Sequence, residues 1–191
     1  MLGAENKLRE ALIPGHITYF YSDATATLVE ENPNFGLSTA YIHDVPRGSI
    51  LIRFHGSGPV PRLIQNKNGY YKNCDYALLT EIDGKPTVFY IELKSTNFEE
   101  RKVAQQLQGG ACILDYLLGF AKRFLEIERV AYQERYVLFH RSRRHSKMMH
   151  LPQPTRVPFL GSGRPNTQPH WALALPDPDR REYSVEDLIR K

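Results

Sequence analysis

The chain has 191 residues, of which 41% are apolar and 11% aromatic, and its formal net charge is +4 at pH 7. This length suits one domain with its own core, and the aromatic content excludes an intrinsically disordered chain. We expect a single domain over 1–191, with a core of about 1–141 and a basic, Pro/Gly-rich C-terminal extension over 142–191. The positive charge favours a polyanionic partner without identifying one.

No segment of the sequence predicts export or insertion into a membrane. The first ten residues, MLGAENKLRE, are charged, and no run approaches the roughly 18 apolar residues that span a bilayer. The two cysteines, Cys74 and Cys112, do not have a metal-ligand spacing. We therefore expect a reduced, cytoplasmic protein without a membrane partner.

The first part of the chain predicts a helix and a strand. Apolar residues recur at helical spacing over 3–13, and Pro14-Gly15 follows immediately. Segment 15–48 mixes Tyr and Thr clusters with Pro and Gly, so no element is assigned there. Ser49–Phe54 (SILIRF) predicts a strand, and the GSGPVP run after it predicts a break.

A β-hairpin is predicted from 74 to 94. Cys74–Ile82 (CDYALLTEI) and Thr87–Lys94 (TVFYIELK) are rich in residues that favour strands, and the intervening DGKP favours a turn. The second strand is the more apolar of the two, so we expect it to be central in a sheet.

A long helix is predicted from Phe98 to about Glu128. It has one apolar stripe at steps of three and four residues, formed by Val103, Leu107, Gly110, Leu114 and Leu117. The Gly109-Gly110 pair costs roughly 2 kcal/mol relative to alanines, which suggests a close approach to the sheet or a kink.

The rest of the chain predicts two strands, Arg135–Arg141 and Trp171–Leu175, and a helix over Ser184–Arg190 that Ser184 caps. A basic cluster without acidic residues follows the first of these strands: Arg141, Arg143, Arg144, His145, Lys147 and His150. Such a run is typical either of a solvated loop or of a nucleic-acid contact.

Two carboxylates and a lysine meet at the open end of the predicted hairpin. With a turn at 83–86, Asp75 lies opposite roughly residue 94, so its carboxylate can approach that of Glu92. Alternation places Glu92 and Lys94 on one face of an apolar strand, where charged groups are costly unless they pair or bind something. Neighbouring carboxylates repel unless a cation lies between them, and Mg²⁺ suits such oxygen ligands.

This pattern resembles the signature of the PD-(D/E)XK nuclease superfamily, an Asp followed by (D/E)-x-K on the adjacent strand, here Asp75 and Glu92-Leu93-Lys94. The proline that names the motif is absent, because Asn73-Cys74 precedes Asp75. The element order is also similar to the restriction-endonuclease-like αβββαβ core, an α/β fold with a mixed central sheet flanked by helices. The resemblance implies a Mg²⁺-dependent nuclease in which Mn²⁺ can substitute.

The resemblance also implies residue roles. Asp75, Glu92 and the backbone carbonyl of Leu93 would hold the metal, and Lys94 would position or activate the attacking water. Superfamily members often add a glutamine from the following helix, where Gln106 is preferred over Gln105. Many carry an upstream glutamate, for which Glu10 is preferred over Glu5, Glu30 and Glu31.

We therefore expect a DNA endonuclease of restriction, repair or antiviral defence, in which Arg141, Arg143, Arg144 and Lys147 contact the nucleic acid. One alternative is a catalytically inactive nuclease-like module that binds nucleic acid or a partner protein. Another is a subunit of a larger complex, and a homodimer is suggested by analogy alone. For Asp75, Glu92 and Lys94, the structural alternative is a surface hairpin with a cross-strand salt bridge.

Overall fold

The computed structural model of the chain describes residues 16–29, 39–54, 72–94, 99–127, 131–140, 155–158, 171–176 and 182–189. Its elements are β1 (Ile17–Tyr19), β2 (Ala24–Val29), β3 (Thr39–Val45), β4 (Ile50–Arg53), β5 (Tyr76–Ile82), β6 (Lys85–Lys94), α2 (Glu100–Phe124), β7 (Gln133–His140), β8 (Thr155–Pro158), β9 (Trp171–Pro176), β10 (Glu182–Ser184) and the 3-10 helix η2 (Glu186–Leu188).

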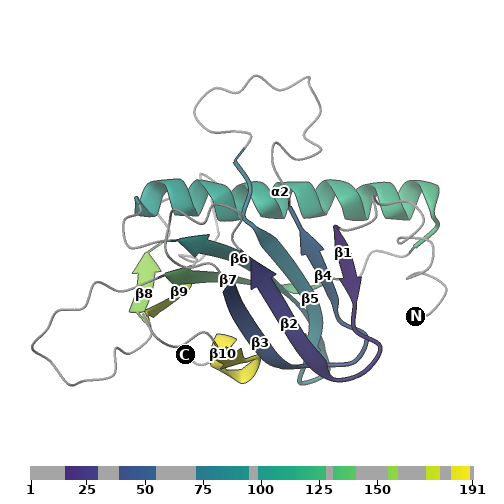
Figure 1. Cartoon of the computed structure of the whole chain (residues 1–191). Helices are drawn as coiled ribbons and strands as arrows, with labels where there is room; N and C mark the ends of the chain where they lie inside the picture. Colours follow the sequence, from purple (N-terminus) through teal and green to yellow (C-terminus); the bar gives the residue numbers. More distant parts are fainter. Residues whose placement is uncertain are drawn as a thin grey trace, which may run out of the picture.

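The elements form three layers (Figure 1). The middle layer is a seven-stranded sheet of order β1-β4-β5-β6-β7-β9-β8, and a second sheet has the order β10-β3-β2. Strands β4, β5 and β6 are antiparallel neighbours, whereas β7 runs parallel to β6 and is joined to it through α2. The fold is therefore mixed α/β, with β6 at the centre of the large sheet.

The hairpin of β5 and β6 turns on two residues. Ile82 pairs with Lys85, and the connecting Asp83 and Gly84 have φ angles of 50° and 72°. Two successive left-handed residues are the geometry of a type I′ turn, which matches the twist of a hairpin and favours Asp-Gly. The local sequence therefore sets the register of the two strands.

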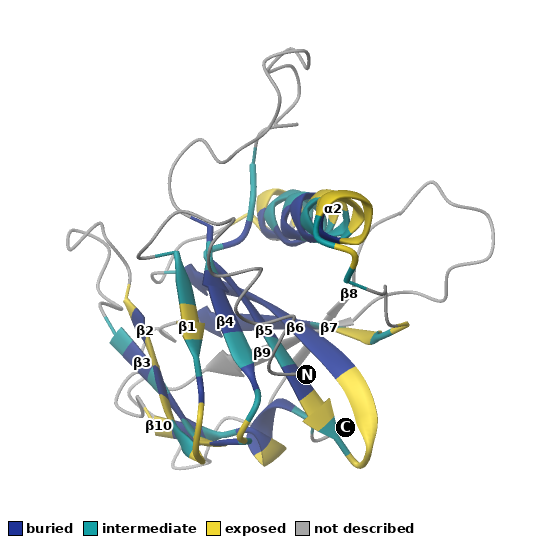
Figure 2. Ribbon diagram, turned by 90° about the vertical axis from the view of Figure 1, so that its right-hand side faces the viewer, coloured by how far each residue is buried: buried dark blue, intermediate teal, exposed yellow. Residues whose placement is uncertain are grey.

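Alternation along β6 divides the core between the two faces of the large sheet. Phe89, Ile91 and Leu93 pack with the second sheet, and Val88 and Tyr90 pack beneath α2. The face of α2 that meets the sheet is buried and the outer face is exposed (Figure 2). Helix α2 thus uses the predicted stripe, to which the structure adds Ala104, Ile113 and Ala121.

The second sheet was not predicted. Segment 15–48, to which the sequence assigned no element, contains β1, β2 and β3. Alternate residues of β2 and β3, Ala26 with Leu28 and Ala40 with Ile42, are buried against the large sheet. Among the residues that the structure describes, a sheet therefore covers the face on which a second layer of helix was expected.

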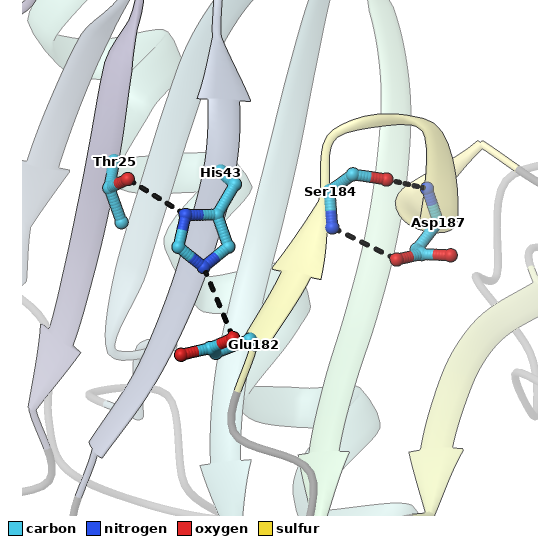
Figure 3. Close-up of polar contacts among 5 residues, drawn as sticks. All are labelled: Thr25, His43, Glu182, Ser184 and Asp187. Atoms are coloured by element: carbon cyan, nitrogen blue, oxygen red, sulfur yellow. Dashed lines mark hydrogen bonds and ion pairs between the residues drawn. The ribbon is translucent and has the colours of Figure 1, made fainter.

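The C-terminal helix expected over Ser184–Arg190 is also shorter than predicted. Only Glu186–Leu188 form a helical turn, of the 3-10 kind. Its start has the reciprocal bonds of a capping box (Figure 3): Ser184 N–H donates to Asp187 Oδ2 at 2.9 Å, and Asp187 N–H donates to Ser184 Oγ at 3.2 Å. Ser184 thus makes the bond expected of a capping residue, although the residue that directly precedes the helical turn is Val185. The predicted helix over 3–13 lies outside the described residues.

Candidate active site

Glu92 and Lys94 lie near the carboxyl end of β6, on the face that α2 covers. The Glu92 side chain is fully buried, and its Oε1 forms an ion pair with Lys94 Nζ. The Lys94 side chain is 27% exposed, so it connects the buried carboxylate with the surface. A carboxylate in an apolar interior is tolerated only when charge or hydrogen bonds compensate its lost hydration, and Lys94 supplies that charge here.

Asp75 is held at the start of β5, across from β6. Its Oδ2 accepts a hydrogen bond of 2.7 Å from Leu93 N–H, between Glu92 and Lys94 in the chain. Its own N–H donates to the carbonyl oxygen of Ile91 at 3.0 Å. The short bond to a backbone donor fixes the orientation of this carboxylate.

The register differs by two residues from the sequence estimate. Tyr76 pairs with Ile91, where the sequence estimate would pair it with residue 93, and Asp75, directly before β5, donates its N–H to the Ile91 carbonyl oxygen. The shift arises because the turn takes two residues instead of the four assumed from DGKP. The ladder ends at this pair, and Asp75 contacts β6 through its bonds to Ile91 and Leu93.

A buried thiol adjoins both carboxylates. Cys74 is fully buried, and its Sγ donates to the carbonyl oxygen of Tyr76 at 3.3 Å. Burial raises the pKa of this thiol well above its usual value, and the negative charges of Glu92 and Asp75 raise it further. Both carboxylates therefore raise the pKa of the same buried thiol.

The donor set suits a hard cation. Asp75, Glu92 and the Leu93 carbonyl offer only oxygen atoms, the ligands that Mg²⁺ prefers, and Mg²⁺ commonly uses one or two carboxylates with water and substrate completing its shell. Over the described ranges, no three His, Cys, Asp or Glu side chains form a cluster able to hold a metal. A magnesium site here would consequently depend on water or phosphate oxygens in addition to these residues.

Apart from Asp75, Glu92, Leu93 and Lys94, the structure describes one further predicted site residue, Gln106. Gln106 is half-buried on α2, four residues before Gly110, so it lies on the side of the helix that contacts Cys74. It forms no hydrogen bond with Asp75, Glu92 or Lys94 within the described part of the chain. Glu10 and the basic residues Arg141, Arg143, Arg144 and Lys147 lie outside the described residues.

Sequence reasoning missed a tyrosine cluster beside the site. Tyr90, two residues before Glu92 on the same face of β6, stacks on Tyr136 of β7 with ring centroids 5.4 Å apart. Burial raises the pKa of both phenols, and the Tyr132 hydroxyl further raises that of Tyr90. Tyr132 in turn donates to Asp115 of α2 at 3.0 Å. Alternation alone could have placed Tyr90 on the face of Glu92, but its partners come from distant segments.

A second polar cluster lies on the outer face of the small sheet (Figure 3). Thr25 Oγ1 and His43 Nδ1 are 2.9 Å apart, and His43 Nε2 is 3.9 Å from Glu182 Oε2. These side chains come from β2, β3 and β10 and connect the three strands. The His43 and Glu182 side chains are 40% and 74% exposed, and exposed pairs of this kind contribute little. We therefore assign this cluster a structural role.

None of the helical segments within the described ranges is both long and apolar enough to span a membrane. Comparison of the sequence with protein-family models and curated proteins, and of the fold with solved structures, gave no match. What the site does is therefore inferred from its own residues and geometry.

Proposed function

We propose that this chain is a Mg²⁺-dependent nuclease that hydrolyses phosphodiester bonds, most readily as a DNA endonuclease. The observation that carries the proposal is a fully buried glutamate on the central strand, with a lysine two residues later and an aspartate that accepts a hydrogen bond from the backbone N–H between them. Charged groups at such a position are costly unless the site uses them.

The order of elements around the site supports a restriction-endonuclease-like core. Strands β4, β5 and β6 form an antiparallel series, α2 follows, and β7 returns parallel to β6. This is the βββαβ portion of the αβββαβ order, with the motif residues at the ends of β5 and β6. The first helix of that order would correspond to 3–13, outside the described residues.

In this proposal, Asp75, Glu92 and Lys94 each have a separate role. A bound Mg²⁺ would lower the pKa of water and offset charge on the phosphate. Asp75 and Glu92 would hold the ion, with Leu93 N–H keeping the Asp75 carboxylate in one orientation. Lys94 is exposed enough to leave Glu92 for a phosphate oxygen, where its ammonium would stabilise the developing negative charge.

The basic cluster supports a nucleic-acid substrate. Lys94 pairs with His140 in the register of β6 and β7, and the cluster begins at the next residue, Arg141. The chain therefore places its most basic segment directly after the strand end that adjoins the site. Arginine and lysine at such a point would neutralise phosphates, and binding would weaken as salt rises.

The proposal is tested by plasmid cleavage in Mg²⁺, Mn²⁺ or EDTA, with wild type beside Asp75→Ala and Lys94→Ala. We expect cleavage in either metal, none in EDTA, and at least about a hundredfold loss in each variant. Lys102→Ala is the matched control, because Lys102 is an exposed lysine paired with Glu99 on the outside of α2. Cleavage that survives chelation or either substitution would refute the assigned site.

One observation favours a second candidate, an inactive nuclease-like module that binds nucleic acid or serves in a larger complex. The Glu92–Lys94 ion pair satisfies both charges without any metal. In that case well-folded protein would retard DNA or RNA in a gel with EDTA present. Lys94→Ala would then leave the retardation unchanged, and no condition would give cleavage.

A further inference from the structure

We propose that Gly109 and Gly110 are positioning residues, which form a notch in α2 that receives segment 72–74 and so fixes Asp75 against Leu93. The catalytic consequence rests on the proposed nuclease function. The structural consequence, the position of Asp75, can be measured without any cleavage.

The two glycines lie where side chains would collide with segment 72–74. A Cβ on Gly109 would be 1.7 Å from the carbonyl oxygen of Lys72, and a Cβ on Gly110 would be 2.2 Å from Cys74 Sγ. Non-bonded carbon contacts are favourable at about 3.5–4.0 Å, so both methyl groups are excluded. Neither glycine has a positive φ, since both lie inside a regular helix. Because glycine weakens a helix relative to alanine, these two are explained by the contact.

The contact leads directly to the site. Segment 72–74 runs into Asp75, whose carboxylate accepts the 2.7 Å bond from Leu93 N–H. The segment is also tied to β4, because Phe54 N–H donates to the Asp75 carbonyl oxygen at 2.9 Å. A shift of about 1 Å in Cys74 would carry Asp75 beyond hydrogen-bond distance of Leu93. Mg²⁺ tolerates still less displacement, because it requires near-ideal octahedral geometry.

The two positions differ in what can relieve the collision. At Gly109 the obstacle is backbone, so no side-chain change restores the space. At Gly110 the obstacle is the Cys74 sulfur, and the next atoms, Cys74 Cβ and Phe54 Cε2, are at an ordinary 3.5 Å. Cys74→Ala should therefore make room for Gly110→Ala, with the new methyl group occupying the volume that the sulfur leaves.

The experiment compares Gly110→Ala, Cys74→Ala, the double variant Cys74→Ala/Gly110→Ala and the control Gly119→Ala. Gly119 is in the same helix, and a Cβ there meets nothing within 4 Å. Amide hydrogen exchange of Leu93 reports the bond to Asp75 in metal-free protein, with the Phe89 and Tyr90 amides of β6 as internal references. Mn²⁺ affinity by calorimetry and kcat and KM for DNA report the site.

We expect Gly110→Ala to speed exchange at Leu93 at least tenfold relative to Phe89 and Tyr90. Mn²⁺ affinity and kcat should fall about 10- to 100-fold, with KM within about twofold. The double variant should recover most of each loss, and Gly119→Ala should change none of them. If Gly110→Ala alone does not fold, the comparison of Cys74→Ala with the double variant decides. Cys74→Ala should speed amide exchange at Leu93, and the methyl group added in the double variant should slow that exchange again.

Uniform loss of protection along β6, with Mn²⁺ affinity retained, would show that the glycines act only on stability and would overturn the proposal. So would a double variant that is no better than its parents at Leu93. If wild type neither cleaves DNA nor binds Mn²⁺, the nuclease function fails, but the exchange pattern at Leu93 still decides whether the notch positions Asp75.

Discussion

At the scale of single residues, the ion pair of Glu92 and Lys94 places a charged group in the apolar interior. A fully buried carboxylate lies against an ammonium here, and such an ion pair offsets part of the cost of burying the two groups. Removal of the ammonium by Lys94→Met should lower the free energy of unfolding by about 3 kcal/mol in EDTA, since it removes the positive charge that lies against a buried carboxylate. Urea unfolding followed by circular dichroism measures this loss.

The double variant Glu92→Gln/Lys94→Met separates charge from packing. Because neither residue is then charged, most of the lost stability should return, while cleavage stays abolished. Lys102→Met, which breaks the exposed pair with Glu99, should change stability by less than about 0.5 kcal/mol. A Lys94→Met protein that unfolds at the same urea concentration as wild type would show that Glu92 is compensated in some other way.

The two thiols should differ in reactivity. Cys112 is exposed on α2, whereas Cys74 is fully buried and has a raised pKa, chiefly because of burial. A small alkylating agent at pH 8 should therefore modify Cys112 in the native protein and leave Cys74 intact, because the thiolate is the reactive form. Mass spectrometry of the digested protein identifies the site, with labelling of both cysteines in urea as the control. Rapid native labelling of Cys74 would contradict its placement under α2.

At the scale of elements, substitution by alanine should change the free energy of unfolding in opposite directions at two glycines in different settings. Gly84→Ala should lower the free energy of unfolding by about 1 kcal/mol. Gly84 lies in the hairpin turn with a φ of 72°, and a side chain strains this left-handed conformation. Gly119→Ala should raise the free energy of unfolding by up to about 1 kcal/mol, because Gly119 faces open space on α2 and alanine favours the helix. Urea unfolding measures both. A loss at Gly119 would mean that its surface is needed for some other contact.

The elements around the site could be predicted from sequence because their signals are local. The Asp83-Gly84 turn, the apolar run of β6 and the stripe of α2 each lie within one continuous stretch. The second sheet was missed for two reasons. Its strand β10 is three residues long and pairs with β3 from the other end of the chain, so it leaves no periodic pattern long enough to read. Strands β2 and β3 do bury alternate residues, but segment 15–48 also contains prolines and glycines, which obscured that alternation.

Only part of the site could be predicted from the sequence. Alternation placed Glu92 and Lys94 on one face of the strand, and their ion pair agrees with that placement. The register of the hairpin was misplaced by two residues because the length of the turn was overestimated. The contact of Gly110 with Cys74 joins a helix to a segment far from it in sequence. A glycine pair indicates a close approach, but it does not say to what.

At the scale of the whole molecule, the layers cover β6, the strand that carries Glu92 and Lys94, and leave it accessible mainly at its two ends. The second sheet packs on one face of β6 and α2 packs on the other (Figure 2), and β5 and β7 occupy its two edges. Residues from Thr87 to Leu93 are consequently buried, whereas Lys94 reaches solvent. Within the described residues, the carboxyl end of β6 is therefore the end from which a ligand could approach Asp75 and Glu92.

In the proposed function, metal binding would be coupled to global stability, because Glu92 lies on the central strand β6 and Asp75 lies directly before β5. An ion that binds only the native state stabilises it by RT ln(1 + [L]/Kd), which is about 2.7 kcal/mol at a hundredfold excess over Kd. For a protein of this size, that gain corresponds to a rise of roughly 5–10 °C in Tm. We expect Mg²⁺ and Mn²⁺ to produce it in differential scanning fluorimetry, with NaCl of equal ionic strength as the control. Asp75→Asn should abolish the metal-dependent part, because it removes one of the two charges that hold the ion; an equal shift in wild type and Asp75→Asn would place the cation elsewhere on the protein.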